Sequence, residues 1–356
     1  TGLSADLWQG TPVETARVVL PMLASKPVSP AAASLARRVL ATGARGPAAG
    51  DQALAGARTS ALIALGDVAA AGRILDRAAG LERNADLSQA AAETALLAGD
   101  TARACSIAEG LSAGRGEAYW LRLRAFCQAQ AGQDAQAQLT FELAQTQARD
   151  AVYGRLMAAR LSGAPPGAAS LRNGLDLALS QALNLDLAAA KPSPAVAAAM
   201  SGGEPATPKF DIAAIDGQIG GLGQTVVSGL PPEAGVSALI SAAAEATEPK
   251  SKVRLQSAAV LLASLANDLP GPDRARVSAF AIPEGKAPAG RNLALEAAAD
   301  SRRVGEAALL VLWTCADAGP AGPALGDRVR IVRTLIRAGL PDDARLFVLE
   351  GLAALK

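Results

Sequence analysis

Apolar residues along most of the chain recur every three to four positions, which is the spacing of one face of an amphipathic helix. The pattern is clearest over residues 52–150, where Gly66, Gly99 and Gly132 each follow an apolar-periodic segment and lie 33 residues apart. Each of these glycines is followed five residues later by an alanine, namely Ala71, Ala104 and Ala137. A fixed period of this length predicts a stack of similar helical units.

The residues around each turn suit the junction of two helices. Glycine adopts at little cost the left-handed conformation that ends a helix. An aspartate just after it can cap the next helix and interact with its positive end; these are Asp67, Asp100 and Asp134. The alanine one turn later lets two helices cross closely. Because one helix pair cannot bury its apolar face alone, we predict an all-α solenoid of stacked antiparallel pairs, with a weaker fourth copy at Gly339 and Ala344.

The pattern resembles the tetratricopeptide-repeat (TPR) family, whose second helix has Ala, a large apolar residue and Ala after the turn glycine. Two copies match well (Ala71, Leu75, Ala78; Ala137, Phe141, Ala144) and two in part (Ala104, Ala108, Leu111; Ala344, Val348, Gly351). The aromatic and Leu residues typical of the first helix are mostly missing, and Trp120 lies one position away. The resemblance covers residues 52–150 and, more weakly, 325–356. The N-terminal part is also similar to uncharacterised Ala-rich secreted proteins of alphaproteobacteria.

One segment between the predicted helices has the composition of a linker. Residues 191–209 contain four prolines, two adjacent glycines and almost no large apolar residue. We therefore expect an N-terminal helical-repeat domain over 1–190 and a C-terminal helical domain over 210–356, with 211–230 ambiguous because it is rich in glycine. Further helices are expected at 12–24, 29–42, 151–161, 171–190, 232–247, 251–268, 272–280, 290–300, 303–317, 325–338 and 341–355.

The composition excludes several classes of function. The chain has 0 His, which removes His-based catalytic triads, His metal ligands and His general bases. A net charge of +1 argues against a nucleic-acid partner or an anionic membrane surface, which would favour a basic excess. No apolar run approaches the roughly 18 residues of a membrane span. We expect no catalytic residues, cofactor or metal.

The compartment and the state of the cysteines are linked questions. The chain begins at Thr1 without a leader, and its Ala-, Arg- and Gly-rich usage is typical of a GC-rich bacterium. We therefore expect a periplasmic protein whose signal peptide has been removed, with the cytoplasm as the alternative. Cys105, Cys127 and Cys315 show no metal-binding spacing. They are small buried hydrophobes, or Cys105 and Cys127 form a disulfide between neighbouring helices.

Three short motifs suggest chemistry and are better explained by structure. Residues 110–114 match G-x-S-x-G, but a helix precedes them and no His base exists. The Gly-rich run 217–223 lacks the Lys of a phosphate loop, and we interpret it as a flexible turn. Asp342 and Asp343 follow Pro341 at a helix start, where carboxylates favour the helix dipole.

Two helical stripes are candidate partner-binding surfaces. In the TPR family, ligands meet first-helix side chains on the concave side, which the resemblance places at Gln89, Glu93, Tyr119, Arg122, Phe126 and Gln130. By spacing alone, the last four of these residues also form one stripe along a helix. This stripe mixes aromatic, Arg and amide side chains. Alternatively, Phe126 packs in the core and Arg122 is solvated. Arg330, Arg333 and Arg337 form a second stripe, either solvated or suited to an acidic partner.

The sequence thus predicts a protein that binds rather than catalyses. We expect a protein–protein interaction scaffold or adaptor in a bacterial envelope complex, such as motor, secretion or cell-wall machinery. The alternatives are a cell-wall or glycan-processing enzyme with scattered carboxylates, and a structural ring or filament subunit that self-associates through its solenoid ends.

Overall fold

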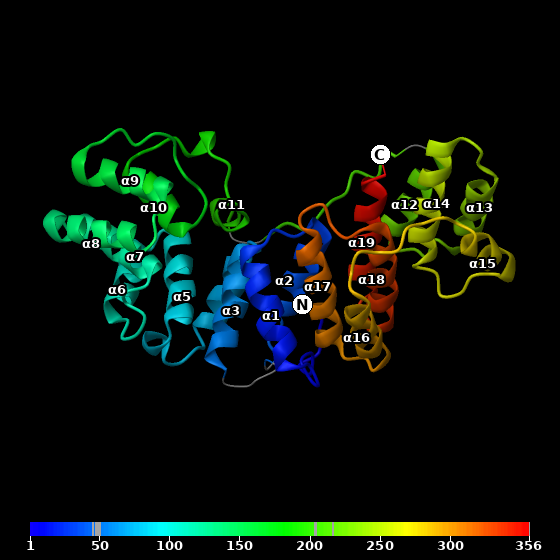
Figure 1. Ribbon diagram of the computed structural model, residues 1–356, viewed down its shortest axis with the longest axis horizontal. Coiled ribbons are helices and arrows are strands. Elements are labelled where there is room, and N and C mark those ends of the chain that lie inside the picture. Colours follow the sequence, from blue (N-terminus) through cyan, green and yellow to red (C-terminus); the bar gives the residue numbers. More distant parts are fainter. Residues whose placement is uncertain (45, 47–50, 203–204, 216, 356) are drawn as a thin grey trace. The chain divides into compact units, whose positions relative to one another are not determined.

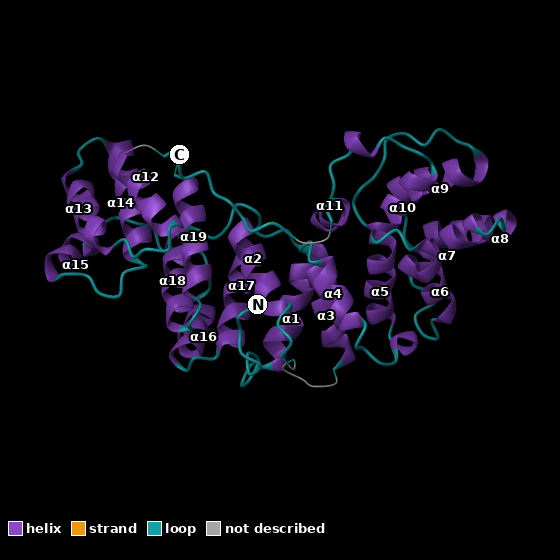
Figure 2. Cartoon of the chain, turned by 180° about the vertical axis from the view of Figure 1, so that it is seen from behind, coloured by secondary structure: helices purple, strands orange, loops and turns teal. Residues whose placement is uncertain are grey.

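The structure, a computed structural model, describes residues 1–44, 46, 51–202, 205–215 and 217–355. Every regular element in these residues is a helix, and no strand occurs among them (Figure 1 and Figure 2). The predicted all-α class is therefore confirmed. The chain forms two compact units. The repeat unit consists of Ala48–Ala206, and the terminal unit combines Thr1–Pro47 with Thr207–Lys356.

Helices of the repeat unit pack in consecutive pairs. The three predicted pairs are α3 with α4, α5 with α6, and α7 with α8, each packed across its own turn. The α-helices are α3 (Gln52–Ala64), α4 (Val68–Leu75), α5 (Ala85–Leu97), α6 (Thr101–Gly110), α7 (Ala118–Gln130), α8 (Asp134–Gln147), α9 (Ala151–Ser162), α10 (Gly174–Ala182) and α11 (Pro194–Met200). Short 3₁₀ turns lie at Leu81–Arg83 and Leu187–Ala189.

The turn glycines end their helices as the sequence predicts. Gly66, Gly99 and Gly132 have φ of 85°, 77° and 74°, the left-handed region that a side chain disfavours. After the first of them, the N–H of Asp67 donates to the carbonyl of Leu62 at 2.9 Å, which closes the helix end in a Schellman arrangement. The same bond follows the other two glycines. The Asp67 carboxylate then accepts from the N–H of Ala70 at 3.0 Å and caps α4.

Alanines occupy the close crossings within each pair. Ala71, Ala104 and Ala137 are fully buried, as the repeat pattern predicts. Around the third pair, Trp120 and Phe126 fill the core together with leucines and alanines from neighbouring helices. The crossings are therefore made of small side chains, and the few large aromatics fill the spaces between them.

A disulfide joins two successive pairs of the repeat unit. Cys105 on α6 is bonded to Cys127 on α7, with their Cα atoms 5.6 Å apart, a usual separation for this bond. Of the two alternatives that the sequence left open, the structure contains the disulfide. Cys315 is free and buried, and burial raises the pKa of its thiol.

The terminal unit combines both ends of the chain. Its helices are α1 (Val13–Ser25), α2 (Pro30–Leu40), α12 (Gly217–Val227), α13 (Glu233–Glu245), α14 (Pro249–Ala263), α15 (Gly271–Ser278), α16 (Ala289–Asp300), α17 (Val304–Ala318), α18 (Leu325–Arg337) and α19 (Pro341–Ala353). Helix α1 packs on α17, and α2 packs on both α17 and α19. Figure 1 shows these blue and orange-red helices side by side.

This division differs from the domains expected at 1–190 and 210–356. The N-terminal helices belong with the C-terminal ones because their apolar faces are buried against α17 and α19. The expected linker, residues 191–209, includes α11, whose Ala195 and Val196 are buried against the repeat unit. Pairing between segments this distant leaves no trace in local periodicity, so the expected boundary followed the chain order instead.

The Gly-rich run at 217–223 is part of a helix, not the flexible turn that the sequence suggested. It forms most of α12 (Gly217–Val227). Two of its glycines face close neighbours, because a Cβ on Gly220 would lie 1.8 Å from the carbonyl oxygen of Ile215, and one on Gly223 would lie 2.5 Å from Ile212. The glycines therefore allow the preceding segment to lie against the helix.

Ala137 provides a test of the crossing between α7 and α8. Replacing Ala137 with Leu inserts extra methylenes where no space remains, and we expect a loss of about 1–3 kcal/mol in the free energy of unfolding. Chemical denaturation followed by circular dichroism measures this loss. The control is Leu139→Ala on the same helix, where the side chain is exposed and the expected change stays within about 0.5 kcal/mol. Equal midpoints for wild type and Ala137→Leu would show that the crossing has room.

Candidate functional site

The six residues expected on the concave side come from α5 and α7, as predicted, but differ in exposure. Phe126 is fully buried in the core of the repeat unit, which agrees with the alternative interpretation of this residue. Gln130 is exposed. The other four, Gln89, Glu93, Tyr119 and Arg122, are half-buried. The last three of these make hydrogen bonds within the chain.

The Glu93 carboxylate forms a hydrogen bond with the first residue of α10. One carboxylate oxygen accepts from the Tyr119 hydroxyl at 2.9 Å, and the other accepts from the N–H of Gly174 at 2.7 Å. Gly174 is the first residue of α10, so the carboxylate satisfies a helix N-terminus. The approach requires glycine, because a Cβ there would lie 2.9 Å from the Glu93 carboxylate and 3.0 Å from the Cβ of Leu96.

Burial decides the protonation behaviour of this pair. Although the Glu93 side chain keeps some solvent exposure, desolvation of its carboxylate raises the pKa, and the hydrogen bonds from Gly174 and Tyr119 oppose that rise only in part. The charge of Asp176 raises it further. Burial, followed by the neighbouring Glu93, also raises the pKa of Tyr119 well above its ordinary value. Both groups therefore favour their neutral forms more than they would in water.

Arg122 connects α7 to the start of α9. Its guanidinium donates to the carbonyl of Ala148 at 2.8 Å, lies 3.8 Å from the Asp150 carboxylate and stands over the Tyr153 ring at 5.7 Å. Asp150 in turn caps α9 and pairs with Arg172 at 3.0 Å. Burial opposes ionisation of Asp150, but the N–H of Tyr153 and the two arginines together lower its pKa below the ordinary value.

The chain's own α10 packs against the α5 part of the face where the resemblance places a ligand. Helix α10 packs against α5 and α9, and Figure 1 shows it beside α5. Its Leu175, Ala178 and Leu179 belong to the same buried core as Leu96 and Phe126. The expected single helix at 171–190 is instead a short helix followed by a 3₁₀ turn. Glu93, Tyr119 and Arg122 therefore have hydrogen-bond partners within the protein itself. Gln130 is the exposed residue of the stripe.

The three arginines of the second stripe also have partners within the terminal unit. On α18, Arg330 lies 3.5 Å from Glu296 and Arg337 lies 2.7 Å from Asp300, both carboxylates of α16. Arg333 donates to the carbonyl of Ala266 at 2.7 Å, at the end of α14. The stripe therefore joins α18 to its neighbours. Arg333 and Arg337 remain exposed to solvent.

The short motifs have structural partners. Ser112 of the G-x-S-x-G match donates to the carbonyl of Glu82 at 2.8 Å. Asp343 is buried and pairs with Arg38, and Asp342 pairs with Arg345 at 2.6 Å. Desolvation raises the pKa of Asp343, and the charge of Arg38 opposes that rise. Among the described residues, no group of acidic or Cys side chains has the arrangement of a metal site.

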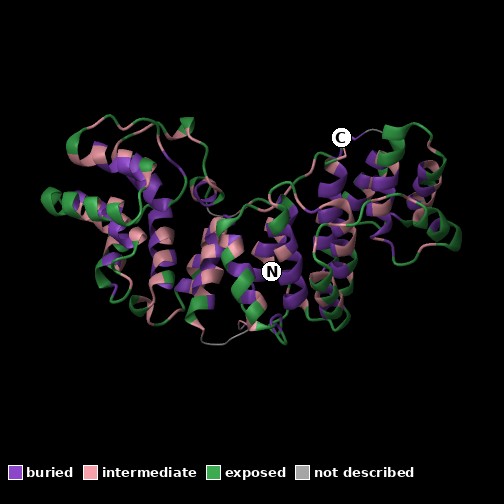
Figure 3. Ribbon diagram, viewed as in Figure 1, coloured by how far each residue is buried: buried purple, intermediate pink, exposed green. Residues whose placement is uncertain are grey.

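Sequence reasoning missed an exposed apolar pair on α8. Leu139 and Leu143 are 69% and 55% exposed and lie four residues apart, and α8 is largely green in Figure 3. A comparison of equivalent positions in the repeat copies could have indicated this pair. Positions seven and eleven residues after the turn glycine are Arg73 and Arg77 in the first copy, and Ser106 and Gly110 in the second. All four are exposed, and the third copy has leucines at the same two positions.

Comparisons with known proteins assign no family. A scan against protein-family models, a search of curated proteins and a search of solved structures each found no match to this chain. Within the described residues, none of the helices combines the length and apolar character needed to cross a membrane.

Glu93→Gln tests the buried carboxylate through the pH dependence of stability. Because folding raises the pKa of Glu93 above its ordinary 4.5, the folded state binds the proton more tightly. The wild type therefore loses stability as pH rises through the raised pKa. Glutamine keeps an acceptor for Gly174 and does not titrate, so we expect its stability relative to wild type to increase between about pH 4 and pH 8.

Urea denaturation at a series of pH values measures this difference. The control is Glu109→Gln on α6, where the side chain is exposed and the difference from wild type should stay flat. Parallel stability curves for wild type and Glu93→Gln would contradict the burial of this carboxylate.

Proposed function

We propose that the protein is a helical-repeat interaction module, a scaffold or adaptor that binds a protein partner through the outer face of α8. The observation that carries this proposal is the exposed pair Leu139 and Leu143 at positions that hold no large apolar residue in the two preceding copies. Single exposed leucines are ordinary on protein surfaces. A pair four residues apart lies on one helix face and offers a partner a continuous apolar strip.

The surroundings of the pair favour a protein partner. Burying one leucine side chain against an apolar surface is worth about 1.5–3 kcal/mol, so the pair supplies a substantial part of a specific contact. The rest of the face is polar, with an exposed Gln138 that donates to Glu142 at 2.8 Å. An apolar centre with a polar surround is the usual composition of a protein interface. Gln130, the exposed residue of the α7 stripe, lies at the end of the helix that precedes α8.

The disulfide supports the proposed compartment. Bonds of this kind persist in oxidising environments such as the bacterial periplasm and are rare in the cytosol, and Cys105 is bonded to Cys127 here. Together with the composition, this supports a place in a periplasmic or envelope-associated complex of the motor, secretion or cell-wall type. The arginines of α18 already have partners in the chain, so they are secondary candidates for contact with an acidic partner.

Charge substitutions on α8 test the binding face. We expect Leu139→Glu/Leu143→Glu to abolish recovery of the partner from native envelope extract, because two buried carboxylates would oppose the contact. The control is Ala102→Glu/Ser106→Glu on α6, which adds the same charges at the same spacing on exposed positions and should leave recovery unchanged. A photo-crosslinking residue at position 139, compared with 106, identifies the partner by mass spectrometry. Equal recovery by both double variants, with equal thermal stability, would defeat the proposal.

Thiol counting tests the compartment. Cells are quenched in acid, and the denatured protein is treated with a maleimide that adds mass to each free thiol. We expect one of the 3 cysteines to react, namely Cys315, because the other two are bonded to each other. A Cys315→Ala variant, which should show no added mass, identifies the reactive residue. Modification of all three cysteines in the native host would place the protein in a reducing compartment.

A further inference from the structure

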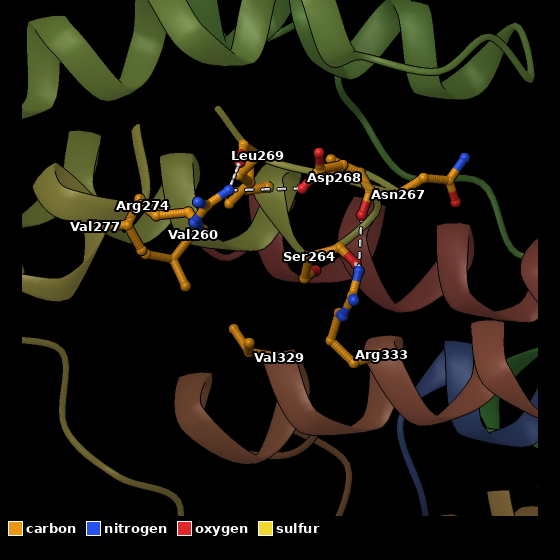
Figure 4. A pocket seen from close by; sticks show the side chains of 11 residues that line it. Val260, Ser264, Asn267, Asp268, Leu269, Arg274, Val277, Val329 and Arg333 are labelled. Carbon is orange, nitrogen blue, oxygen red and sulfur yellow. Dashed lines mark hydrogen bonds and ion pairs between the residues drawn. The ribbon is translucent and has the colours of Figure 1, made fainter. Parts of the chain in front are cut away.

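A cavity of about 320 Å³ lies in the terminal unit between α14, α15 and α18. Its walls include four half-buried aliphatic side chains, Val260, Leu269, Val277 and Val329. Figure 4 shows Val329 on one side and Val260 and Val277 on another, with the space between them. This volume is at the lower end of the range for small-molecule sites, which are typically apolar with a few placed polar groups.

Two arginines from different helices border this cavity. Arg274 comes from α15 and Arg333 from α18, and Figure 4 shows them reaching it from two sides. Arg274 donates to the carbonyl of Leu269 and lies 3.8 Å from Asp268. Arg333 donates to the carbonyl of Ala266 at 2.7 Å. Among the described residues, one terminal nitrogen of each guanidinium makes these bonds, which leaves its other N–H donors for a ligand.

We propose that this cavity binds a small aliphatic carboxylate, with the acid group at Arg274 and Arg333 and the alkyl group among the valines. A guanidinium matches a carboxylate in shape and binds it by two parallel hydrogen bonds. The carbonyls of Leu269 and Ala266 already fix both side chains, so less side-chain freedom is lost on binding.

The charge around the cavity selects an anion. Its lining contains two arginines and one carboxylate, Asp268. The Arg274 side chain is 63% exposed and the Asp268 side chain 92% exposed, so solvent screens their attraction and leaves the positive charge of Arg274 largely uncompensated. The other three arginines of α18, Arg328, Arg330 and Arg337, pair with Glu350, Glu296 and Asp300 and do not line the cavity. The aliphatic walls distinguish this site from a simple anion site, because inorganic phosphate or acetate would leave the valines uncovered. This binding is separate from the protein contact proposed for α8.

Valine-methyl NMR of the whole chain tests the proposal, with hexanoate as the probe. We expect hexanoate to shift the methyl signals of Val260, Val277 and Val329 in a saturable way, and to leave methyls of the repeat unit unchanged. Hexanamide, which has the same chain without the charge, should bind at least about tenfold more weakly. Acetate and inorganic phosphate, which lack the chain, should also bind at least about tenfold more weakly.

Two variants separate the acid contact from the alkyl contact. Arg274→Gln/Arg333→Gln should weaken hexanoate binding about tenfold or more, and Val329→Phe should abolish it by filling the cavity. Unchanged methyl spectra elsewhere in each variant show that the fold is kept. No saturable shift in the wild type, equal binding of hexanoate and hexanamide, equal binding of hexanoate and phosphate, or unaltered binding in Val329→Phe would each overturn the proposal.

Discussion

Glu350 is the residue through which distant parts of the terminal unit are tied together. One of its carboxylate oxygens accepts from the N–H of Ala31 at 2.9 Å, and the other from Arg328 at 2.7 Å, and both contacts are buried. A buried charge is tolerated only when it is paired and hydrogen-bonded. Arg328 donates as well to the carbonyl of Phe347 at 3.0 Å. The position of α2 between α17 and α19 therefore depends on the Glu350 carboxylate, which is 319 residues from Ala31 in sequence.

The repeat unit contains a similar contact between a carboxylate and the start of a distant helix. Glu93 on α5 accepts from the N–H of Gly174, as Glu350 on α19 accepts from Ala31. In both cases a carboxylate on a central helix satisfies the first turn of a helix that is distant in sequence. Asp327 provides a third example of a buried carboxylate that accepts from distant backbone, the N–H groups of Lys286 and Ala287. Because an alanine-rich core supplies little apolar area per residue, these polar contacts help to fix where α2, α10 and the segment before α16 lie.

The local structure of this chain could be predicted from sequence, whereas its long-range packing could not. Gly66, Gly99 and Gly132 marked the helix ends because their left-handed conformation is a property of the residue itself. The stripe on α7 was placed on the right helix, but Tyr119 donates to Glu93 of α5 and Arg122 binds the start of α9, and nothing in the periodicity of α7 shows these partners. Likewise, Arg330 and Arg337 look free on a helical wheel, and their carboxylates lie on α16.

The bond between Cys105 and Cys127 bears on how the repeat unit comes apart. In a linear array of repeats, each unit contacts its neighbours, so the array can fray from one end in steps. The bond crosses the junction between the second and third helix pairs and makes that junction covalent. Opening of either pair then leaves the other tethered beside it, which favours their reclosing together. The bond therefore couples α5 to α8 into one cooperative block within an otherwise stepwise array.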